Sequence, residues 1–466
     1  MITLTPILNE GLPEPLYRQL FDYIRNAIVN RDILPGDKLP SLRLLSESLD
    51  ISVTTVELAY EQLLVEGYIS SRPRSGYFVS AISPGSGLVR PAPEASDPAH
   101  HLSRSFFEST PPEDSFLDPS CFDFLKWKNC ANRIFNDYST LLLTEGDIQG
   151  EPPLRDEISR YIYQARGVRC SLDQVVVAAG TQQLINILCI ILNGMGIDHV
   201  SFENPGYIPV RSIFKDRGFK MTLVPIDRDG IRIEKLPANI PSTVYVSPSN
   251  QFPTGSIMPA PRRYDLLDWA KNNNSIIIED DYNSELRYDS RPVPSLQGLD
   301  NSGRVVYLGS FSSTLFPSIK ISYMVLPLTL HELFKESLTG YIQTCSKAEQ
   351  LTLALYMNSG FYQTNLRKQR SLNARKLQIA TEDIIKYGGN SVRILNSSSG
   401  LHMLLKIPNR GRTIEQICGT AAASGFTIAP ITGYEKDDDN SVVMFYYTRI
   451  PIESMRQAVR ILLHVV

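Results

Sequence analysis

Apolar residues along the first part of the chain recur at helical spacing and predict three short helices. The first is indicated by residues three and four positions apart: Leu16, Leu20, Tyr23, Ile24, Ala27 and Ile28. Pro35-Gly36 breaks this pattern, and a second helix begins at Pro40-Ser41. Ser52 is placed to cap a third helix, which ends at Glu66-Gly67 because glycine suits the left-handed position after a helix.

Two short strand-like segments, residues 68–70 and 77–79, follow the third helix. Three short helices and a terminal hairpin are the order of a winged helix-turn-helix, which docks on DNA through its third helix and its hairpin loop. We expect the first turn of the third helix, residues 52–55, to face the bases. Arg72 and Arg74, in the hairpin loop, are expected against the DNA backbone or in the minor groove.

The rest of the chain alternates strands and helices. β-branched runs at residues 175–177, 243–246, 276–278 and 305–307 predict strands, and residues 182–192 predict one of the helices between them. Such alternation is typical of an α/β fold whose mostly parallel sheet is covered on both faces. Ligands of such sheets bind at the carboxyl ends of the strands.

The two units are separated by a segment rich in Pro, Gly, Ser and Ala, without an apolar period. It predicts a linker, partly flexible and partly extended, over residues 80–104. The expected domains are therefore a DNA-binding head at residues 1–79 and an effector-sensing domain at residues 105–466. A smaller C-terminal lobe of the second domain is expected at roughly residues 345–466.

Composition narrows the classes of protein. Hydrophobic residues make up 42% of the 466 residues, which excludes a mostly disordered chain, and the net charge of −3 indicates no particular partner. No run of eighteen apolar residues and no basic segment followed by an apolar stretch is present, so we expect a cytoplasmic protein without a membrane span. The six cysteines form no CxxC pair and predict no metal site.

Ordered motifs in the first unit carry a resemblance: Pro40-Ser41-Leu42-Arg43, Ile51 to Val56, Ala59 to Leu63, Glu66-Gly67 and Gly76-Tyr77-Phe78-Val79. Residues 15–79 resemble the GntR family of bacterial regulators. The resemblance implies double-stranded operator DNA as a partner, and the DNA-binding residues expected from it and from the fold are Ser41, Arg43, Ser52, Thr54, Thr55, Arg72, Arg74 and Gly76. One departure is Val53, where the family usually has Arg or Lys, which puts one contact in doubt.

The net charge of the N-terminal head argues against DNA binding. Residues 1–79 hold seven Arg and Lys against ten Asp and Glu, a net of −3, whereas DNA-binding domains are usually basic. The alternative is a protein-interaction module. We favour DNA because Arg43, Arg72 and Arg74 lie where this fold meets the duplex. A weakly basic head also suggests that two heads pair on one operator.

Motifs in the second unit resemble fold-type I aminotransferases from about Phe122 to the end. They are Gln149-Gly150, Leu154-Arg155, Arg166-Gly167-Val168, Ala179 to Gln182, Asn204 to Tyr207, Pro248 to Gly255, Glu279 to Glu285 and the region of Arg449. The chain is most similar to the MocR/GabR subfamily, in which a GntR head is fused to such a domain. This resemblance implies pyridoxal 5′-phosphate (PLP) as cofactor, a small-molecule effector and a head-to-tail homodimer.

Each matched residue has a candidate role toward PLP. Gly180, Thr181 and Gln182 begin a helix whose N–H groups suit a phosphate, although an ordinary helix cap is the alternative. Asp280, at a strand end, suits the pyridine nitrogen, or else caps a turn. Tyr207 and Tyr282 suit the ring face and ring hydroxyl, or else belong to the core. Arg449 suits an effector carboxylate, or else a structural ion pair. The full expected cofactor set is Gly180, Thr181, Gln182, Tyr207, Asn250, Asp280, Tyr282, Ser310, Ser312, Ser313 and Lys320.

The segment Ser310 to Tyr323 departs from the family where the chemistry matters most. The family has Ser-x-Ser-Lys, then Gly and Arg, and here Ser313 stands at the position of the Schiff-base lysine. Ser318 stands at the Gly position and Lys320 at the phosphate-binding Arg position. A hydroxyl neither forms a Schiff base with an aldehyde nor shuttles a proton to carbon, so we expect no turnover. PLP is then expected only non-covalently.

Three functions follow for the whole chain. The first, which we favour, is a DNA-binding transcription regulator that senses a ligand without catalysis: PLP, a PLP–amine adduct or an amino-acid-like molecule. The second is a PLP-dependent aminotransferase with an appended DNA-binding head, in which Lys320 replaces the missing amine. The third is a regulator or scaffold that no longer binds PLP. Binding and trapping of PLP separate the three.

Overall fold

The computed structural model describes residues 4–6, 8–9, 11, 14–73, 75–81, 118–281, 283–288, 293–389, 391–397, 400–424, 426–431 and 439–466. The chain forms two compact units, Met1–Ser109 and Thr110–Val466. From residue 82 on, the expected linker at residues 80–104 lies outside the described residues. Each unit is therefore considered by itself.

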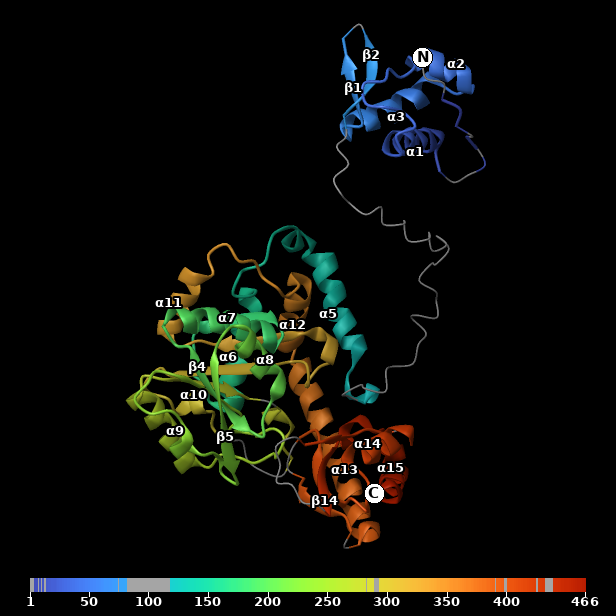
Figure 1. Cartoon of the computed structure of the whole chain (residues 1–466). Coiled ribbons are helices and arrows are strands. Elements are labelled where there is room, and N and C mark those ends of the chain that lie inside the picture. The colour runs from blue at the N-terminus through green and yellow to red at the C-terminus, as the bar shows by residue number, and fades with distance from the viewer. Residues whose placement is uncertain are drawn as a thin grey trace. The chain divides into compact units, whose positions relative to one another are not determined.

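The first unit has the expected three helices and hairpin (Figure 1). Its elements are α1 (Leu16–Val29), α2 (Leu42–Leu49), α3 (Val53–Val65), β1 (Ile69–Arg72) and β2 (Gly76–Val79), with β1 and β2 antiparallel. Leu20, Ile24, Val56 and Leu63 are among the buried residues that join α1 and α3 in one core. A winged helix-turn-helix fold is thus confirmed.

Two serines set where the second and third helices begin. The Ser41 hydroxyl accepts a hydrogen bond from Leu44 N at 3.3 Å, and the Ser52 hydroxyl accepts one from Thr55 N at 3.1 Å. Each serine satisfies a backbone donor that the first turn of a helix leaves unpaired. At the other end of α3, Gly67 has φ +77°, the left-handed conformation that ends the helix without strain.

The second unit is built on a mixed sheet whose strands lie in the order β3-β10-β9-β8-β7-β4-β5-β6. The strands are β3 (Val175–Ala179), β4 (His199–Asn204), β5 (Lys220–Asp227), β6 (Gly230–Ile231), β7 (Thr243–Val246), β8 (Ile276–Asp280), β9 (Val305–Ser310) and β10 (Ile321–Val325). The pairs from β5 through β4, β7 and β8 to β9 are parallel, whereas β10 and β6 pair antiparallel with their neighbours. The expected mostly parallel sheet is confirmed.

Both faces of this sheet are buried because successive side chains of a strand point to opposite faces. Val175 and Val177 pack with α5 (Phe124–Asp137), α6 (Pro152–Arg166) and α12 (Lys347–Asn358). Val176 and Ala178 pack on the other face. The helices there are α7 (Thr181–Gly194), α8 (Ile208–Asp216) and α11 (Leu328–Ser337). The continuous β-branched runs in the sequence reflect this two-sided burial.

Shorter elements complete the large part of the domain. The α-helices α9 (Ala260–Asn272) and α10 (Leu296–Leu299) enclose a further apolar core. The 3-10 helices are η1 (Pro119–Cys121), η2 (Ser139–Leu143), η3 (Leu172–Gln174), η4 (Ile233–Lys235), η5 (Ser284–Leu286) and η6 (Pro317–Ile319). Of these, η5 and η6 follow β8 and β9 and so lie close in sequence to the carboxyl ends of two central strands.

The C-terminal lobe is a separate antiparallel sheet with helices against it. Its strands, in the order β11-β12-β14-β13, are β11 (Arg393–Asn396), β12 (Met403–Pro408), β13 (Ile428–Pro430) and β14 (Asn440–Phe445). Its helices are α14 (Ile414–Ala423), η7 (Tyr447–Arg449), η8 (Ile452–Ser454) and α15 (Met455–Val465). The long helix α13 (Phe361–Gly388) runs from the large part into this lobe (Figure 1).

The apolar core of the lobe starts later than the boundary expected near residue 345. Leu353 and Tyr356 of α12, and Tyr362 and Leu366 of α13, belong to the core of the large part. The lobe core begins at Leu377, in the second half of α13. The boundary therefore falls inside a continuous helix, which apolar periodicity alone does not reveal because the period is the same on both sides.

Among the residues that the structure describes, no helix is long and apolar enough to cross a membrane. The same residues contain no group of three or more His, Cys, Asp or Glu side chains able to hold a metal ion. All six cysteines are free thiols.

Candidate functional site

A cavity of about 470 Å³ opens at the carboxyl ends of the parallel strands. It brings together most of the residues expected to bind a cofactor: Gly180, Thr181, Gln182, Tyr207, Asp280, Ser310, Ser312, Ser313 and Lys320. Asn250 is buried and is not one of the lining residues, and Tyr282 lies outside the described residues. The lining also includes Ala179, Ser247, Phe252, Asp281, Asn283 and Ser322.

One end of the cavity is suited to an anion. Gly180 has φ +86°, which turns the chain from β3 into α7 and leaves the N–H groups of Thr181 and Gln182 without an acceptor in the described part of the chain. Positive partial charge gathers at such a helix start. Hydroxyl groups line the same wall, with Ser322 Oγ 2.9 Å from Ser310 Oγ and 3.5 Å from Thr181 Oγ1.

Lys320 adds a full positive charge to this set of donors. It lies at φ +48°, between η6 and β10, and its side chain is exposed and lines the cavity. No hydrogen bond or ion pair within the described residues occupies its ammonium group. A left-handed lysine costs of order 1 kcal/mol or more and persists where the surrounding structure holds it.

The other end of the cavity carries carboxylates. Asp280, the last residue of β8, accepts a hydrogen bond from the phenol of Tyr245 on the neighbouring strand β7. Burial raises the pKa of Asp280 to about 6, although the bond from Tyr245 opposes this shift. Sequence analysis missed Tyr245, because only the pairing of β7 with β8 brings it to Asp280.

The neighbouring carboxylate, Asp281, is held ionised. Its two oxygens lie 2.8 and 3.0 Å from Arg166 Nε and Nη2, and Tyr307 donates a third hydrogen bond at 2.6 Å. Burial alone would raise the pKa of Asp281, but Arg166 and these hydrogen bonds lower it below its ordinary value. The cavity therefore contains a permanent anion next to Asp280.

Asn283 is a further lining residue that the sequence motif did not single out. It follows β8, has φ +54° and is only 2% exposed. Within the described part of the chain, neither its Oδ1 nor its Nδ2 has a hydrogen-bond partner. Buried amides are nearly always paired in native proteins, so an unpaired one beside a cavity needs an explanation.

Ser313 lies in the wall of the cavity, where the family resemblance places a lysine amine. Its backbone carbonyl accepts a hydrogen bond from Gln369 Nε2 of α13 at 3.2 Å, which fixes the segment after β9. The side chain offers a hydroxyl and no amine. Among the described lining residues Lys320 alone carries a primary amine, and it belongs to the segment before β10.

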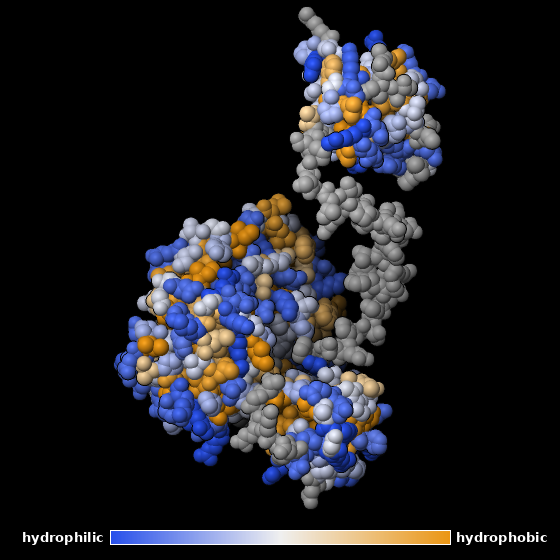
Figure 2. Space-filling view, in the orientation of Figure 1, coloured by the Kyte–Doolittle hydropathy of each residue, from blue (hydrophilic) through white to orange (hydrophobic). Residues whose placement is uncertain are grey.

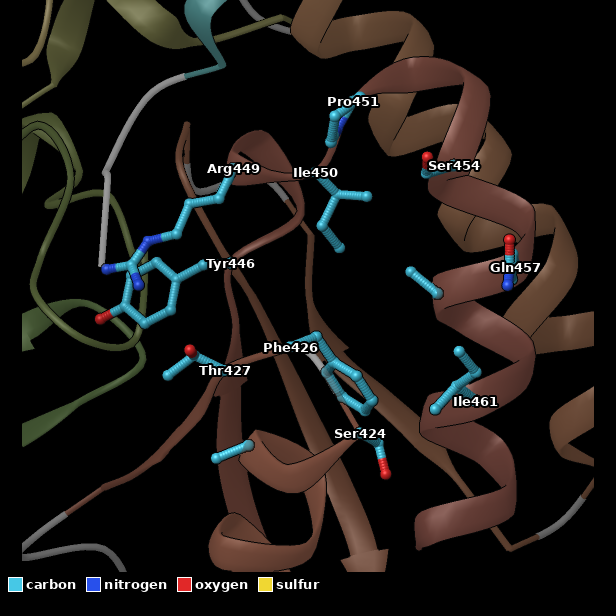
Figure 3. A pocket seen from close by; sticks show the side chains of 12 residues that line it. Ser424, Phe426, Thr427, Tyr446, Arg449, Ile450, Pro451, Ser454, Gln457 and Ile461 are labelled. Atoms are coloured by element: carbon cyan, nitrogen blue, oxygen red, sulfur yellow. The ribbon is translucent and has the colours of Figure 1, made fainter. Parts of the chain in front are cut away.

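Arg449, the expected effector residue, lines a different cavity of about 340 Å³ in the C-terminal lobe. Figure 3 shows its side chain extended beside Tyr446 and directed away from the apolar residues Phe426 and Ile461. The guanidinium carbon lies 4.3 Å from the centre of the Tyr446 ring, a cation–π contact. The structure thus does not bring Arg449 into the lining of the cavity at the strand ends.

A row of aromatic rings connects the two regions. The Tyr446 ring lies 5.6 Å from His402, His402 lies 5.8 Å from Phe252, and Phe252 lies 6.1 Å from Tyr207, centre to centre. His402 Nε2 donates to Pro253 O at 2.9 Å, and burial lowers the pKa of this histidine to about 4. A neutral, packed histidine therefore joins the lobe to the large part of the domain.

The head has a groove of its own, with a volume of about 480 Å³. It is lined by the start of α2, the start of α3 and the hairpin, and contains Ser41, Arg43, Val53 and Gly76. Lys38, which sequence analysis did not single out, also lines it because a β-bridge pairs Lys38 with Phe78. Among the described lining residues two are cations and none carries a carboxylate, so the acidic side chains of the head lie outside this described lining.

The remaining DNA-binding candidates surround this groove. Ser52 and Thr55 join their hydroxyls at 2.8 Å across the first turn of α3, where Thr54 is exposed. Arg72 lies over the Phe78 ring, 4.5 Å from its centre, and Arg74 lies outside the described residues. A polar, cationic surface at a helix start and a wing is the arrangement that a DNA backbone requires.

Comparison with protein families gives two matches, one to each unit. Residues 16–79 match the gntR family of bacterial regulatory proteins, and residues 124–407, more than half of the chain, match aminotransferase class I and II. Among solved structures, the multiple substrate aminotransferase of Thermococcus profundus is 24% identical with a TM-score of 0.64, and covers 75% of this chain and 89% of its own. That likeness establishes the fold of the second unit.

Several relatives share both units. YhdI of Bacillus subtilis, an uncharacterized HTH-type transcriptional regulator, is 37% identical over 98% of this chain and 97% of its own length. YdeL of the same organism, with the same description, is 41% identical over 87% and 86%. The probable rhizopine catabolism regulatory protein MocR of Rhizobium meliloti is 31% identical over 91% and 88%. The chain therefore belongs to the family of HTH-type transcriptional regulators that join a gntR-family head to a class I and II aminotransferase domain.

Proposed function

We propose that this chain is a transcription regulator whose aminotransferase-like domain binds a small-molecule effector without turning it over. The observation that supports the proposal is that Ser313 lines the cavity, at the position where the family resemblance leads us to expect a lysine amine. Transamination requires a basic nitrogen that both holds the cofactor and moves a proton to and from carbon. A serine does neither.

The residues present fit the phosphate and the ring of PLP but not its covalent attachment. The N–H groups of Thr181 and Gln182, with Lys320, would hold the phosphate. Asp280 would pair with the ring nitrogen through the oxygen that Tyr245 leaves open, and Tyr207 would pack on the ring. When bound, PLP supplies an electron-withdrawing ring. We therefore propose non-covalent binding of PLP, a PLP–amine adduct or an amino-acid-like molecule.

Arg449 is proposed as the group that binds an effector carboxylate, through the planar fork that suits two oxygens. The aromatic row from Tyr446 through His402 to Phe252 supports this role, because it joins the Arg449 segment to the cavity wall. Closing of the lobe around a ligand would change the angle between the lobe and the large part. The linker would then pass this change to the heads.

Operator DNA is proposed to bind along the groove that contains Arg43 and Lys38. We further propose a head-to-tail homodimer, as the family resemblance implies. Exposed apolar side chains support association: Leu125 on α5 is 67% exposed, and Leu143 on η2 is 85% exposed. Figure 2 shows apolar side chains gathered over η2 and the adjoining part of the domain. A surface of this kind on a water-soluble domain marks an interaction site.

Absorbance and mass spectra of the purified chain, with and without added PLP, test the proposal. We expect added PLP to raise the thermal midpoint, and borohydride to leave the chain unlabelled. A reducible adduct together with exchange of amino groups between an amino acid and a keto acid would make the chain an enzyme and overturn the proposal. An unchanged midpoint at millimolar PLP and millimolar amino acid would indicate a regulator without this sensing function.

A further inference from the structure

The groove of the head contains an apolar side chain that does not serve the core. Val53, the first residue of α3, lines the groove and is 42% exposed. It is not among the described residues that form the apolar core of the head or pack against it, whereas Val56, three residues further along α3, is fully buried there. Packing within the head therefore explains Val56 but not Val53.

The start of α3 does not require a valine either. Ser52 supplies the helix cap, because its hydroxyl accepts a hydrogen bond from Thr55 N, and this cap needs no particular side chain at position 53. A β-branched residue is also one of the weaker helix formers, since its side chain loses rotamer freedom in a helix. Neither the core nor the helix start thus accounts for this residue.

A single exposed valine is ordinary on a protein surface, so its surroundings decide what it does. Lys38, in the segment before α2, and Arg43, in the first turn of α2, are exposed and line the same groove as Val53. Such cations bind the phosphates of a duplex and fix the register of the protein on it without distinguishing the bases. The third helix of this fold enters the major groove with its first turn, which places Val53 toward the base edges.

A valine side chain can recognise one feature of the major groove. It has no hydrogen-bond donor or acceptor, so it cannot pair with the polar groups on the base edges. Of the groups that the four base pairs present in the major groove, only the C5-methyl group of thymine is apolar. The chemistry of Val53 therefore matches thymine and no other base.

We infer that Val53 recognises a thymine of the operator by contact with its C5-methyl group, while Lys38 and Arg43 bind nearby phosphates. The inference rests on the proposed function, since it requires DNA to lie along this groove. It goes beyond that function by naming a base, and the group on that base, within the site that one head covers. An apolar contact with a base would thus replace the contact that the resemblance puts in doubt at position 53.

Deoxyuridine isolates the methyl group, because it differs from thymidine by that group alone. The full-length chain would first select an operator from a random DNA pool, and each thymine of this operator would then be replaced singly by deoxyuridine. Fluorescence anisotropy at constant salt gives the dissociation constants. We expect at least one thymine at which loss of the methyl group weakens binding about fourfold, which is the effect of burying one methylene-sized group.

Two valine-to-alanine variants on the same helix assign the contact. In Val53→Ala the thymine and deoxyuridine operators should bind with nearly equal affinity, because the partner of the methyl group is gone. Val65→Ala is the matched control, since Val65 is the last residue of α3, is 87% exposed and is not one of the groove-lining residues. It should keep the fourfold difference. Both variants should keep the thermal midpoint of the wild type, because neither side chain belongs to the core.

The outcomes separate the inference from the proposed function. If deoxyuridine has no effect at any thymine, the inference is overturned and an operator-binding regulator remains. A methyl effect that persists in Val53→Ala, or that disappears equally in Val65→Ala, would overturn the role of Val53. If the full-length chain selects no DNA sequence from the pool, the inference fails together with the proposal that this groove binds an operator.

Discussion

Lys376 and Asp118 form a buried ion pair, with 2.7 Å between Lys376 Nζ and Asp118 Oδ2 and side-chain exposures of 0% and 6%. Lys376 Nζ also donates to Thr448 O at 3.0 Å. Thr448 directly precedes Arg449, and Asp118 precedes η1 near the start of the domain. One ammonium group therefore joins α13, the start of the domain and the segment that carries Arg449.

Lys376→Met should lower the free energy of unfolding of the second unit by about 3 kcal/mol, because it leaves the buried Asp118 carboxylate without its counter-charge, with only the hydrogen bonds from Ser120. The exposed pair Lys220–Asp198 provides the control: its nitrogen and oxygen are 2.8 Å apart, but the side chains are 73% and 60% exposed. Lys220→Met should change the stability by less than about 1 kcal/mol. Chemical denaturation followed by circular dichroism measures both, and equal effects would contradict the assigned role of burial.

Glu203→Gln should stabilise the second unit at pH 8 by about 2–3 kcal/mol. Burial raises the pKa of Glu203 to about 7, so the folded chain keeps a proton that the unfolded chain loses near pH 4.5. The stability that protonated Glu203 contributes is complete below pH 4.5 and is lost as the pH rises to about 7. The thermal midpoint of the variant should therefore exceed that of the wild type by more at pH 8 than at pH 5. Glu336→Gln, at an exposed carboxylate, should leave the pH profile unchanged, and an identical profile for Glu203→Gln would show that Glu203 is ionised when folded.

Arg43→Ala should weaken binding to operator DNA about tenfold or more without changing the thermal midpoint. Arg43 is exposed in the groove and makes no hydrogen bond or ion pair within the described residues, so its loss removes only a DNA contact. Gel shifts with DNA selected from a random pool by the full-length chain measure the affinity. Arg25→Ala, which removes the same charge from α1 beside Asp22, should have a much smaller effect. Similar losses for both variants would point to net charge rather than a contact at the groove.

Ser313→Lys should allow PLP to be fixed to the chain by borohydride, because the variant supplies an amine at the position where the family resemblance implies the anchoring lysine. Mass spectrometry of peptides locates the label. Ser312→Lys, in the same cavity wall, is the control and should remain unlabelled or nearly so. Labelling of the wild type at Lys320 would contradict non-covalent binding.

Local signals in the sequence were sufficient for most of the fold. The helix caps at Ser41 and Ser52 and the end of α3 at Gly67 could be predicted, because each depends only on neighbours within a few residues. The strand runs at Val175 and Ile276 reflect burial on both faces, which is also encoded locally. Most of the cofactor residues that were expected from the order of the motifs line one cavity in the structure.

The residues that escaped prediction depend on pairing over long distances. Tyr245 reaches Asp280 only because β7 and β8 pair in parallel, with Tyr245 opposite Ile278. Lys38 reaches the groove only through its bridge to Phe78. Asn283 depends on a left-handed turn after β8 that asparagine permits but does not require. Such contacts are set by tertiary structure, and no periodicity marks them.

The continuity of α13 has a mechanical consequence. With 28 residues the helix is about 42 Å long, and its first turns are packed in one core while its last turns are packed in another. If the C-terminal lobe tilted by about 5° about one end of this helix, the other end would move by roughly 4 Å. Because Lys376 lies in this helix and is paired with Asp118, such a tilt would also reach the start of the domain.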